Sequence, residues 1–157
     1  MITADTVSSD EITIDAPIQL VWDVLVNFAD YGKWNTFCPE CDAELEIGSP
    51  IRMQVDLGFG LQEQVEYICR IDPPQAIAWK MDTKPGDPIH AVRTQYLRQV
   101  DETTTVYVSV DEFSGDGVPM MMETLGKAVE DGFNNCGYGL KRHAEQLFTE
   151  KGGLGNG

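Results

Sequence analysis

The chain has 157 residues, enough for one domain with a sizeable core, and its 42% apolar and 24% charged residues are ordinary for a globular protein. Twenty-six acidic residues against eleven basic ones give a formal net charge of −15. Because such a surface repels phosphate backbones and anionic lipid headgroups, we expect no nucleic-acid partner and no partner at a membrane surface.

The N-terminal stretch MITADTVSSDE has neither the basic region nor the apolar run of a signal peptide. No apolar stretch approaches the roughly 18 residues that a membrane span needs, so we expect no span and a cytoplasmic location. Four cysteines are few for a disulfide scaffold of this length, and they indicate free buried thiols.

The first predicted elements are a strand and a helical pair. Residues 9–15 alternate apolar and polar side chains and predict a short strand. Asp15 is then placed to cap a helix, and the stretch 17–31 carries one broad apolar face. Gly32 interrupts that pattern, and a second short helix is expected beyond it.

From Ala43 the hydrophobic period changes to two, which predicts strands separated by turn signals such as GFG, DPP and KPGDP. The alternating stretches are 51–57, 64–71, 77–81, 90–100 and 106–110. A long final helix is expected from near Pro119. Antiparallel strands between a helical pair and one long helix predict an α+β fold in which helix packs on sheet.

The final helix carries four glycines, each of which costs about 1 kcal/mol relative to alanine in a helix interior. They are Gly126, Gly132, Gly137 and Gly139. All four fall on the flanks of the apolar stripe, where missing side chains either admit a close backbone approach or leave space. We interpret them as cavity-making glycines. The alternative is a helix broken near NNCGYG, but the stripe keeps its phase across the glycines.

Four motifs resemble a known superfamily. They are DAPIQLVWDVLVNFADYGKWNTF (15–37), AIAWKM (76–81), DEFSG (111–115) and LKRHAEQ (140–146). Over residues 9–150 the chain resembles the START-related, Bet v 1-like helix-grip superfamily, in its polyketide cyclase/dehydrase and lipid-transport branch. Two stretches depart from that pattern: CPEC (38–41), and the polar pair Arg93 and Gln95.

The resemblance implies a curved antiparallel sheet of about six or seven strands wrapped around the long C-terminal helix, with two short helices after the first strand. It also implies one ligand-binding domain at 9–150, followed by a flexible tail at 151–157. Proteins with this fold typically hold an apolar ligand between sheet and helix.

Residues expected to line such a cavity are mostly large and apolar. They are Trp34, Phe37, Met53, Phe59, Tyr67, Trp79, Arg93, Gln95, Phe113, Met121, Leu125 and Val129. Arg93 and Gln95 would anchor a ligand carbonyl or carboxylate if their strand face points inward. If Tyr96 points inward instead, they are surface residues. Strand period alone leaves this open.

The candidate catalytic residues are Arg93, Asp111 and His143, with no specific role assigned. His143 is either an acid/base facing the cavity or a partner of a backbone carbonyl, and Asp111 either orients a ligand or pairs with a loop amide. Cys38 and Cys41 form a C-x-x-C without a second pair, which favours incidental thiols over a metal or redox site. We therefore expect no metal and no cofactor.

Three functions are compatible with these observations. The first is a binding module for a small hydrophobic or aromatic ligand that is lipid-like, polyketide-like or isoprenoid. The second is an enzyme of the cyclase/dehydrase kind that moves protons with polar cavity residues. The third is an interaction protein whose groove grips a peptide. The oligomeric state and the ligand's identity are left unassigned.

Overall fold

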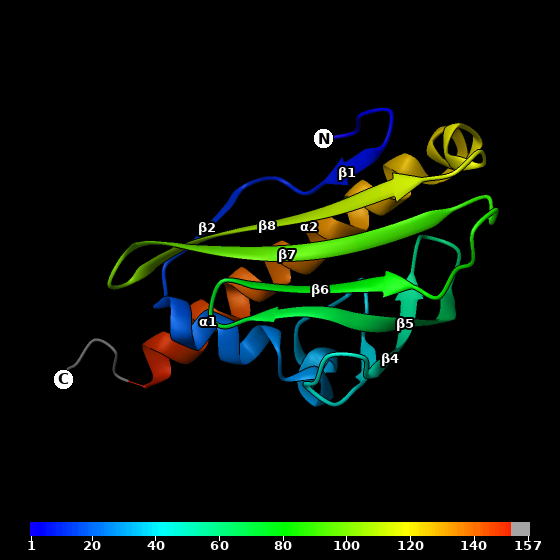
Figure 1. Ribbon diagram of the computed structural model, residues 1–157. Coiled ribbons are helices and arrows are strands. Elements are labelled where there is room, and N and C mark those ends of the chain that lie inside the picture. The colour runs from blue at the N-terminus through cyan, green and yellow to red at the C-terminus, as the bar shows by residue number, and fades with distance from the viewer. Residues whose placement is uncertain (152–157) are drawn as a thin grey trace.

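An eight-stranded antiparallel sheet is the frame of the protein, seen in a computed structural model that describes residues 1–151 (Figure 1). Its strands are β1 (Thr6–Ser8), β2 (Ile12–Ile14), β3 (Glu40–Asp42), β4 (Pro50–Asp56), β5 (Leu61–Asp72), β6 (Ala76–Met81), β7 (His90–Asp101) and β8 (Thr104–Ser114). The predicted tail at 151–157 lies, except for Lys151, outside the described residues.

The strand order is β1-β8-β7-β6-β5-β4-β3, with β2 also paired to β8. Hairpins join β4 through β8 in sequence, as expected where short turns separate alternating strands. The predicted α+β helix-grip fold is confirmed. The sheet has eight strands because the N-terminal edge is divided into β1 and β2, and because Glu40–Asp42 adds a short strand. β1 precedes residue 9, where the ligand-binding domain was expected to begin.

Two short helices follow β2, the predicted number: α1 (Ile18–Leu25) and the 3₁₀ helix η1 (Phe28–Lys33). Their bounds differ from the prediction, since α1 ends at Leu25 and η1 contains Gly32 instead of lying beyond it. Asp15 does not cap α1, because Pro17 occupies the N-cap position without a side-chain hydrogen bond. The Asp15 N–H instead donates to Glu145 Oε2 at 2.8 Å, so it joins the start of α1 to the last helix.

The last helix, α2 (Val118–Glu150), runs without interruption through NNCGYG and crosses one face of the curved sheet (Figure 1). Pro119 stands in its first turn, where its missing N–H costs nothing. The alternative of a broken helix is therefore wrong. No helix among residues 1–151 is long and apolar enough to cross a membrane.

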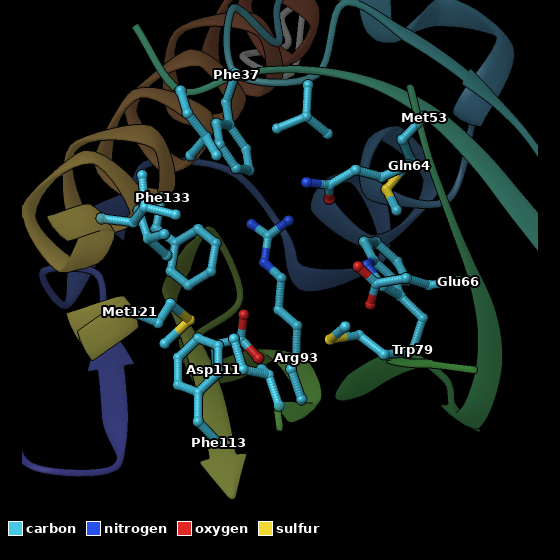
Figure 2. A pocket seen from close by; sticks show the side chains of 17 residues that line it. Phe37, Met53, Gln64, Glu66, Trp79, Arg93, Asp111, Phe113, Met121 and Phe133 are labelled. Atoms are coloured by element: carbon cyan, nitrogen blue, oxygen red, sulfur yellow. The ribbon is translucent and has the colours of Figure 1, made fainter. Parts of the chain in front are cut away.

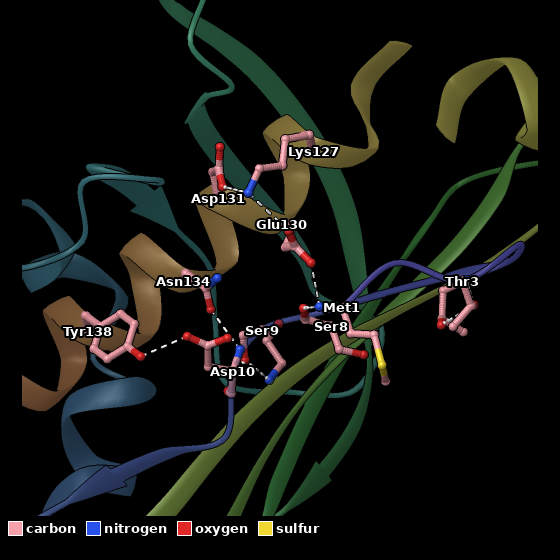
Figure 3. A network of polar contacts seen from close by, with 12 residues as sticks. Met1, Thr3, Ser8, Ser9, Asp10, Lys127, Glu130, Asp131, Asn134 and Tyr138 are labelled. Atoms are coloured by element: carbon pink, nitrogen blue, oxygen red, sulfur yellow. Dashed lines mark hydrogen bonds and ion pairs between the residues drawn. The ribbon is translucent and has the colours of Figure 1, made fainter. Parts of the chain in front are cut away.

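Polar contacts join α2 to the N-terminal segment (Figure 3). The Asp10 N–H donates to Asn134 Oδ1 at 2.7 Å, and the Tyr138 hydroxyl donates to Asp10 Oδ2 at 2.8 Å. One turn earlier, the Met1 ammonium lies 2.6 Å from Glu130 Oε2. Exposed pairs of this kind contribute little energy each, but together they fix the outer side of α2 against the sheet edge.

Candidate functional site

A pocket of about 210 Å³ lies between the sheet and the N-terminal half of α2. α1 packs against α2, and the core next to it is filled by side chains such as Leu25, Tyr107 and Leu140. The part of α2 from Met121 to Phe133 lines the pocket. The hollow therefore lies at the end of α2 away from α1, where a single helix covers the sheet.

The pocket includes most of the side chains that were expected to line a cavity. From the predicted set it contains Phe37, Met53, Trp79, Arg93, Phe113, Met121, Leu125 and Val129. Asp111, a candidate catalytic residue, lines it as well (Figure 2). The strand face left open by the sequence is thereby assigned: Arg93 and Gln95 are 6% and 1% exposed, whereas Tyr96 is 36% exposed.

Arg93 is a buried cation surrounded by aromatic rings. Its guanidinium carbon lies 4.2 Å from the centre of the Phe133 ring, 5.5 Å from that of Phe37 and 5.7 Å from that of Trp79. Such contacts are attractive because each ring face is electron-rich. Nε donates to Ser109 Oγ at 2.9 Å, and Nη2 lies 3.5 Å from Gln95 Oε1. Arg93 makes no ion pair within the described part of the chain.

Two carboxyl groups share the pocket with this cation. Arg93 and Asp111 stand directly opposite each other on β7 and β8, and Glu66 reaches in from β5. Figure 2 shows the two carboxyl groups on either side of the Arg93 side chain. Asp111 Oδ1 is fully buried and accepts no hydrogen bond from any described residue.

Burial dominates the protonation of both carboxyl groups. It raises the pKa of Asp111 to about 7, against the opposing attraction of Arg93 and with added repulsion from Glu112. It likewise raises the pKa of Glu66 to about 7, helped by repulsion from Asp111 and opposed by Arg93. The pocket therefore holds one permanent positive charge and two groups that exchange protons near neutrality.

Glu66 and Gln64 were missed because β5 contains a β-bulge. The register of β5 against β6 shifts between Ile68 and Arg70, and Ile68, only 1% exposed, is the inward partner of Trp79. Counting back by two from Ile68 puts Glu66 and Gln64 on the inner face. The alternation of apolar and polar residues does not reveal a single extra residue in a strand. The sequence prediction therefore placed the apolar residues of this stretch, Tyr67 among them, in the interior.

Four residues of the predicted lining set lie outside the pocket. The β5 bulge puts Tyr67 on the opposite strand face, and Phe59 is 67% exposed at the tip of the β4–β5 hairpin. Trp34 is buried beside Tyr31, with a ring-centre separation of 4.9 Å. Gln95 lies behind Arg93, where its Oε1 accepts the Tyr107 hydroxyl at 2.6 Å.

The two histidines also lie away from the pocket. His143 stands ten residues beyond Phe133, about 15 Å along the helix axis, and lines shallow hollows beside Trp34. It donates to no backbone carbonyl within residues 1–151, so neither predicted role is realised. His90 begins β7, where its Nδ1 lies 2.5 Å from Thr83 Oγ1. Of the three candidate catalytic residues, the pocket brings together Arg93 and Asp111.

The interpretation of the α2 glycines as cavity-making is corrected. None of the four lines the pocket. A Cβ on Gly132 would overlap the Phe37 ring, one on Gly137 would overlap Ile12, and one on Gly139 would overlap the Trp34 carbonyl oxygen. These three admit a close approach of neighbouring groups to the helix. At Gly126 a Cβ would make ordinary contacts.

The C-P-E-C stretch lies next to the pocket wall. Cys38 is buried and its thiol donates to the Glu40 carbonyl at 3.3 Å, while Cys41 is half-buried at β3. The neighbouring Cys41 thiol lowers the pKa of Cys38. All four cysteines are free thiols, and residues 1–151 contain no group of three or more His, Cys, Asp or Glu side chains placed to hold a metal ion.

Comparison with known families and structures gives one family match and three similar solved structures. A family model described as Activator of Hsp90 ATPase homolog 1-like protein matches residues 15–147. No curated protein matches the chain. Among solved structures, the ZhuI aromatase/cyclase from Streptomyces sp. R1128 is similar at 20% identity and a TM-score of 0.70, covering 90% of this chain and 93% of that one.

A START superfamily protein from Mycobacterium smegmatis is 14% identical with a TM-score of 0.70, covering 91% of this chain and 99% of that one. The di-domain aromatase/cyclase BexL from the BE-7585A biosynthetic pathway is 20% identical with a TM-score of 0.68. The match covers 91% of this chain and 51% of BexL, so the chain spans about half of that protein. At these identities the likenesses show the fold.

Proposed function

The chain belongs to the Activator of Hsp90 ATPase homolog 1-like family, and from the pocket that its fold encloses we propose that it binds a small hydrophobic or aromatic molecule between the sheet and α2. The single observation that carries this proposal is the apolar-walled pocket with one buried cation, Arg93, which forms no ion pair within residues 1–151. The ligand-binding domain comprises the predicted residues 9–150, with β1 completing its sheet edge.

Pocket size limits the ligand. A cavity of about 150 Å³ holds one benzene molecule, and ordinary small-molecule sites begin near 300 Å³. A pocket of about 210 Å³ suits one aromatic ring with short substituents. A site of this size also favours a small molecule over the side chains of a gripped peptide.

Affinity would come from burial against apolar and aromatic walls. Phe113, Leu125 and Val129 offer surfaces whose contact with a ligand is worth about 25 cal/mol per Å² of apolar area removed from water. The polar groups at the inner end would then select and orient the ligand, because an unmatched polar group in such a place is costly.

Paired methionines on α2 allow a matched test. Met121 lines the pocket, whereas the adjacent Met120 is 73% exposed. Native mass spectrometry of the purified protein, followed by denaturing extraction, should detect a bound apolar compound in wild type and in Met120→Trp. Met121→Trp, which fills the pocket, should lack it. Equal occupancy in both variants would contradict binding at this site.

A second function, a proton-transferring enzyme of the cyclase/dehydrase kind, is favoured by one observation. Asp111 and Glu66, with pKa values near 7, flank a cation that would stabilise an enolate. The likeness to aromatase/cyclases is in keeping with this candidate. Acetophenone in D₂O provides a test, because an enzyme of this kind should speed deuterium exchange at its methyl group. Exchange at the same rate with wild type and Asp111→Asn would count against it.

A further inference from the structure

Unsatisfied polar groups meet at the inner end of the pocket. The Arg93 guanidinium has five N–H donors, and its hydrogen bonds to Ser109 and Gln95 use only Nε and Nη2. Across the β7–β8 ladder, Asp111 Oδ1 is buried and accepts no hydrogen bond from the described residues. A donor and an acceptor thus stand side by side, and each is available to the same ligand group.

Resting on the proposed binding function, we infer that the ligand is a small aromatic carboxylic acid whose carboxylate accepts hydrogen bonds from Arg93 and shares one proton with Asp111. Its ring lies against the apolar wall formed by Phe113, Met121 and Leu125. One ring with a carboxyl group matches the size of the pocket, about 210 Å³.

Other ligand groups suit this pair less well. A ketone carbonyl accepts from Arg93 but gives nothing to Asp111 Oδ1, and a primary amide, which can bond to both, brings no negative charge to balance the Arg93 cation. An ammonium group pairs with Asp111 and is repelled by Arg93. A carboxyl group serves both, since one oxygen accepts from the guanidinium while the other is joined to Asp111 by a bridging proton.

The charges around the site require that proton. Arg93 supplies one positive charge from β7, while Asp111 on β8 and Glu66 on β5 supply two negative charges when both are ionised. α2 presents only apolar side chains to the pocket, and the exposed Glu112 adds a further negative charge to β8. A ligand carboxylate entering a fully ionised site is therefore repelled, whereas protonation of Asp111 leaves Arg93 to hold it.

Protonation near neutrality makes this coupling measurable. The pKa of Asp111, raised by burial to about 7, keeps the group largely protonated below pH 7. Tyr107 and Cys136, which lie behind Arg93, are buried and uncharged in this range because burial raises the pKa of each. Above pH 7 each bound carboxylate must bring one proton with it, which corresponds to about a tenfold loss of affinity per pH unit.

Isothermal titration of the wild-type protein with benzoate and with neutral benzamide, between pH 6 and pH 9, tests the inference. The Kd for benzoate should stay level below pH 7 and rise about tenfold per unit above it, and that for benzamide should not change. At pH 8, buffers of different ionisation enthalpy should report uptake of one proton per benzoate. A Kd for benzoate that does not change between pH 6 and pH 9 overturns the inference.

Two isosteric variants locate the proton. In Asp111→Asn the rise of the benzoate Kd above pH 7 should disappear, because the amide cannot titrate. In Glu66→Gln, the matched change at the other carboxyl group, the rise should persist. An unchanged rise in Asp111→Asn overturns the assignment, and the wild-type titration remains decisive if that variant does not fold.

The outcomes separate this inference from the proposed function. If benzamide binds, Met121→Trp abolishes that binding, and benzoate does not bind, the pocket is a site for neutral aromatic molecules and only the carboxylic acid is wrong. If neither probe binds and extraction yields no apolar compound, the binding function fails with it.

Discussion

Arg93 is the residue on which the site depends. A guanidinium holds its charge in any protein environment, so burying it requires compensation. Three aromatic ring faces and the hydrogen bond to Ser109 supply part of this compensation. No carboxylate forms an ion pair with Arg93 within residues 1–151. The two carboxyl groups nearby are partly protonated near pH 7, so the charge of Arg93 is not fully neutralised and can bind an anionic ligand group.

Asp111 should make the free energy of unfolding depend on pH. Its folded pKa, about 7, lies above the unfolded value of about 3.9, so the native state binds more protons between these limits. The stability that this group contributes is therefore present in full below about pH 4 and is lost as the pH rises towards 7.

Asp111→Asn, which keeps the shape and removes the titration, should stabilise the protein at pH 8 relative to wild type by on the order of 1 kcal/mol, since Asp111 is only half-buried. At pH 5 the gain should be much smaller. Urea unfolding at both pH values measures this, with Glu102→Gln in the exposed turn between β7 and β8 as control. An equal gain in the free energy of unfolding at both pH values would show that burial does not raise the pKa of Asp111.

At the scale of elements, hydrophobic periodicity correctly predicted the helices and strand faces that follow a regular repeat in the sequence. The apolar stripe of α2 and the alternation in β7 located the helix, and gave Arg93 and Gln95 as a pair on one face. It failed at β5, where one bulged residue between Ile68 and Arg70 moves Glu66 to the inner face. A bulge arises from strand pairing and sheet curvature, which a single strand's sequence does not encode.

The glycines of α2 differ in what surrounds them, and this gives a matched pair of substitutions. Gly139→Ala puts a methyl group against the Trp34 backbone carbonyl, which cannot move aside, and should destabilise the protein by about 2 kcal/mol or more. Gly126→Ala meets only Met122 and Ile2 at ordinary distances, and should stabilise it by up to about 1 kcal/mol.

Thermal unfolding of the two alanine variants, followed by circular dichroism, checks both signs. If Gly139→Ala is as stable as wild type, Gly139 is not needed for a close approach of the Trp34 carbonyl, and its interpretation as a cavity-making glycine is favoured again.

At the scale of the whole molecule, the pocket results from uneven coverage of the sheet. α1 packs against α2 and the core beside it is filled, whereas the pocket lies against residues 121–133 of α2. The motifs that predicted the helix-grip fold also predicted an interior between sheet and helix. The volume left empty depends on how Phe37, Phe133 and Trp79 pack around Arg93, and such three-dimensional packing is not readable from spacing.

The net charge of −15 should make stability depend on salt. Self-repulsion among exposed carboxylates opposes the compact state, and the screening length falls from about 10 Å at 0.1 M to about 3 Å at 1 M salt. The Tm should therefore rise between 0.05 M and 1 M NaCl. KCl at equal ionic strength should act alike, because screening does not distinguish the two cations. A Tm that falls or stays level would contradict a repulsive surface.

The central claim is that the pocket under the N-terminal half of α2 binds a small aromatic molecule, and methionine methyl groups report on it most directly. Met53, Met81 and Met121 line the pocket, while Met120 is exposed beside it. In a titration of ¹³C-methyl-methionine protein with benzoate at pH 6, or with benzamide, ring currents should shift the three pocket methyl resonances and leave that of Met120 in place. Pocket resonances that stay fixed with both probes, while Met120 moves, would contradict the account.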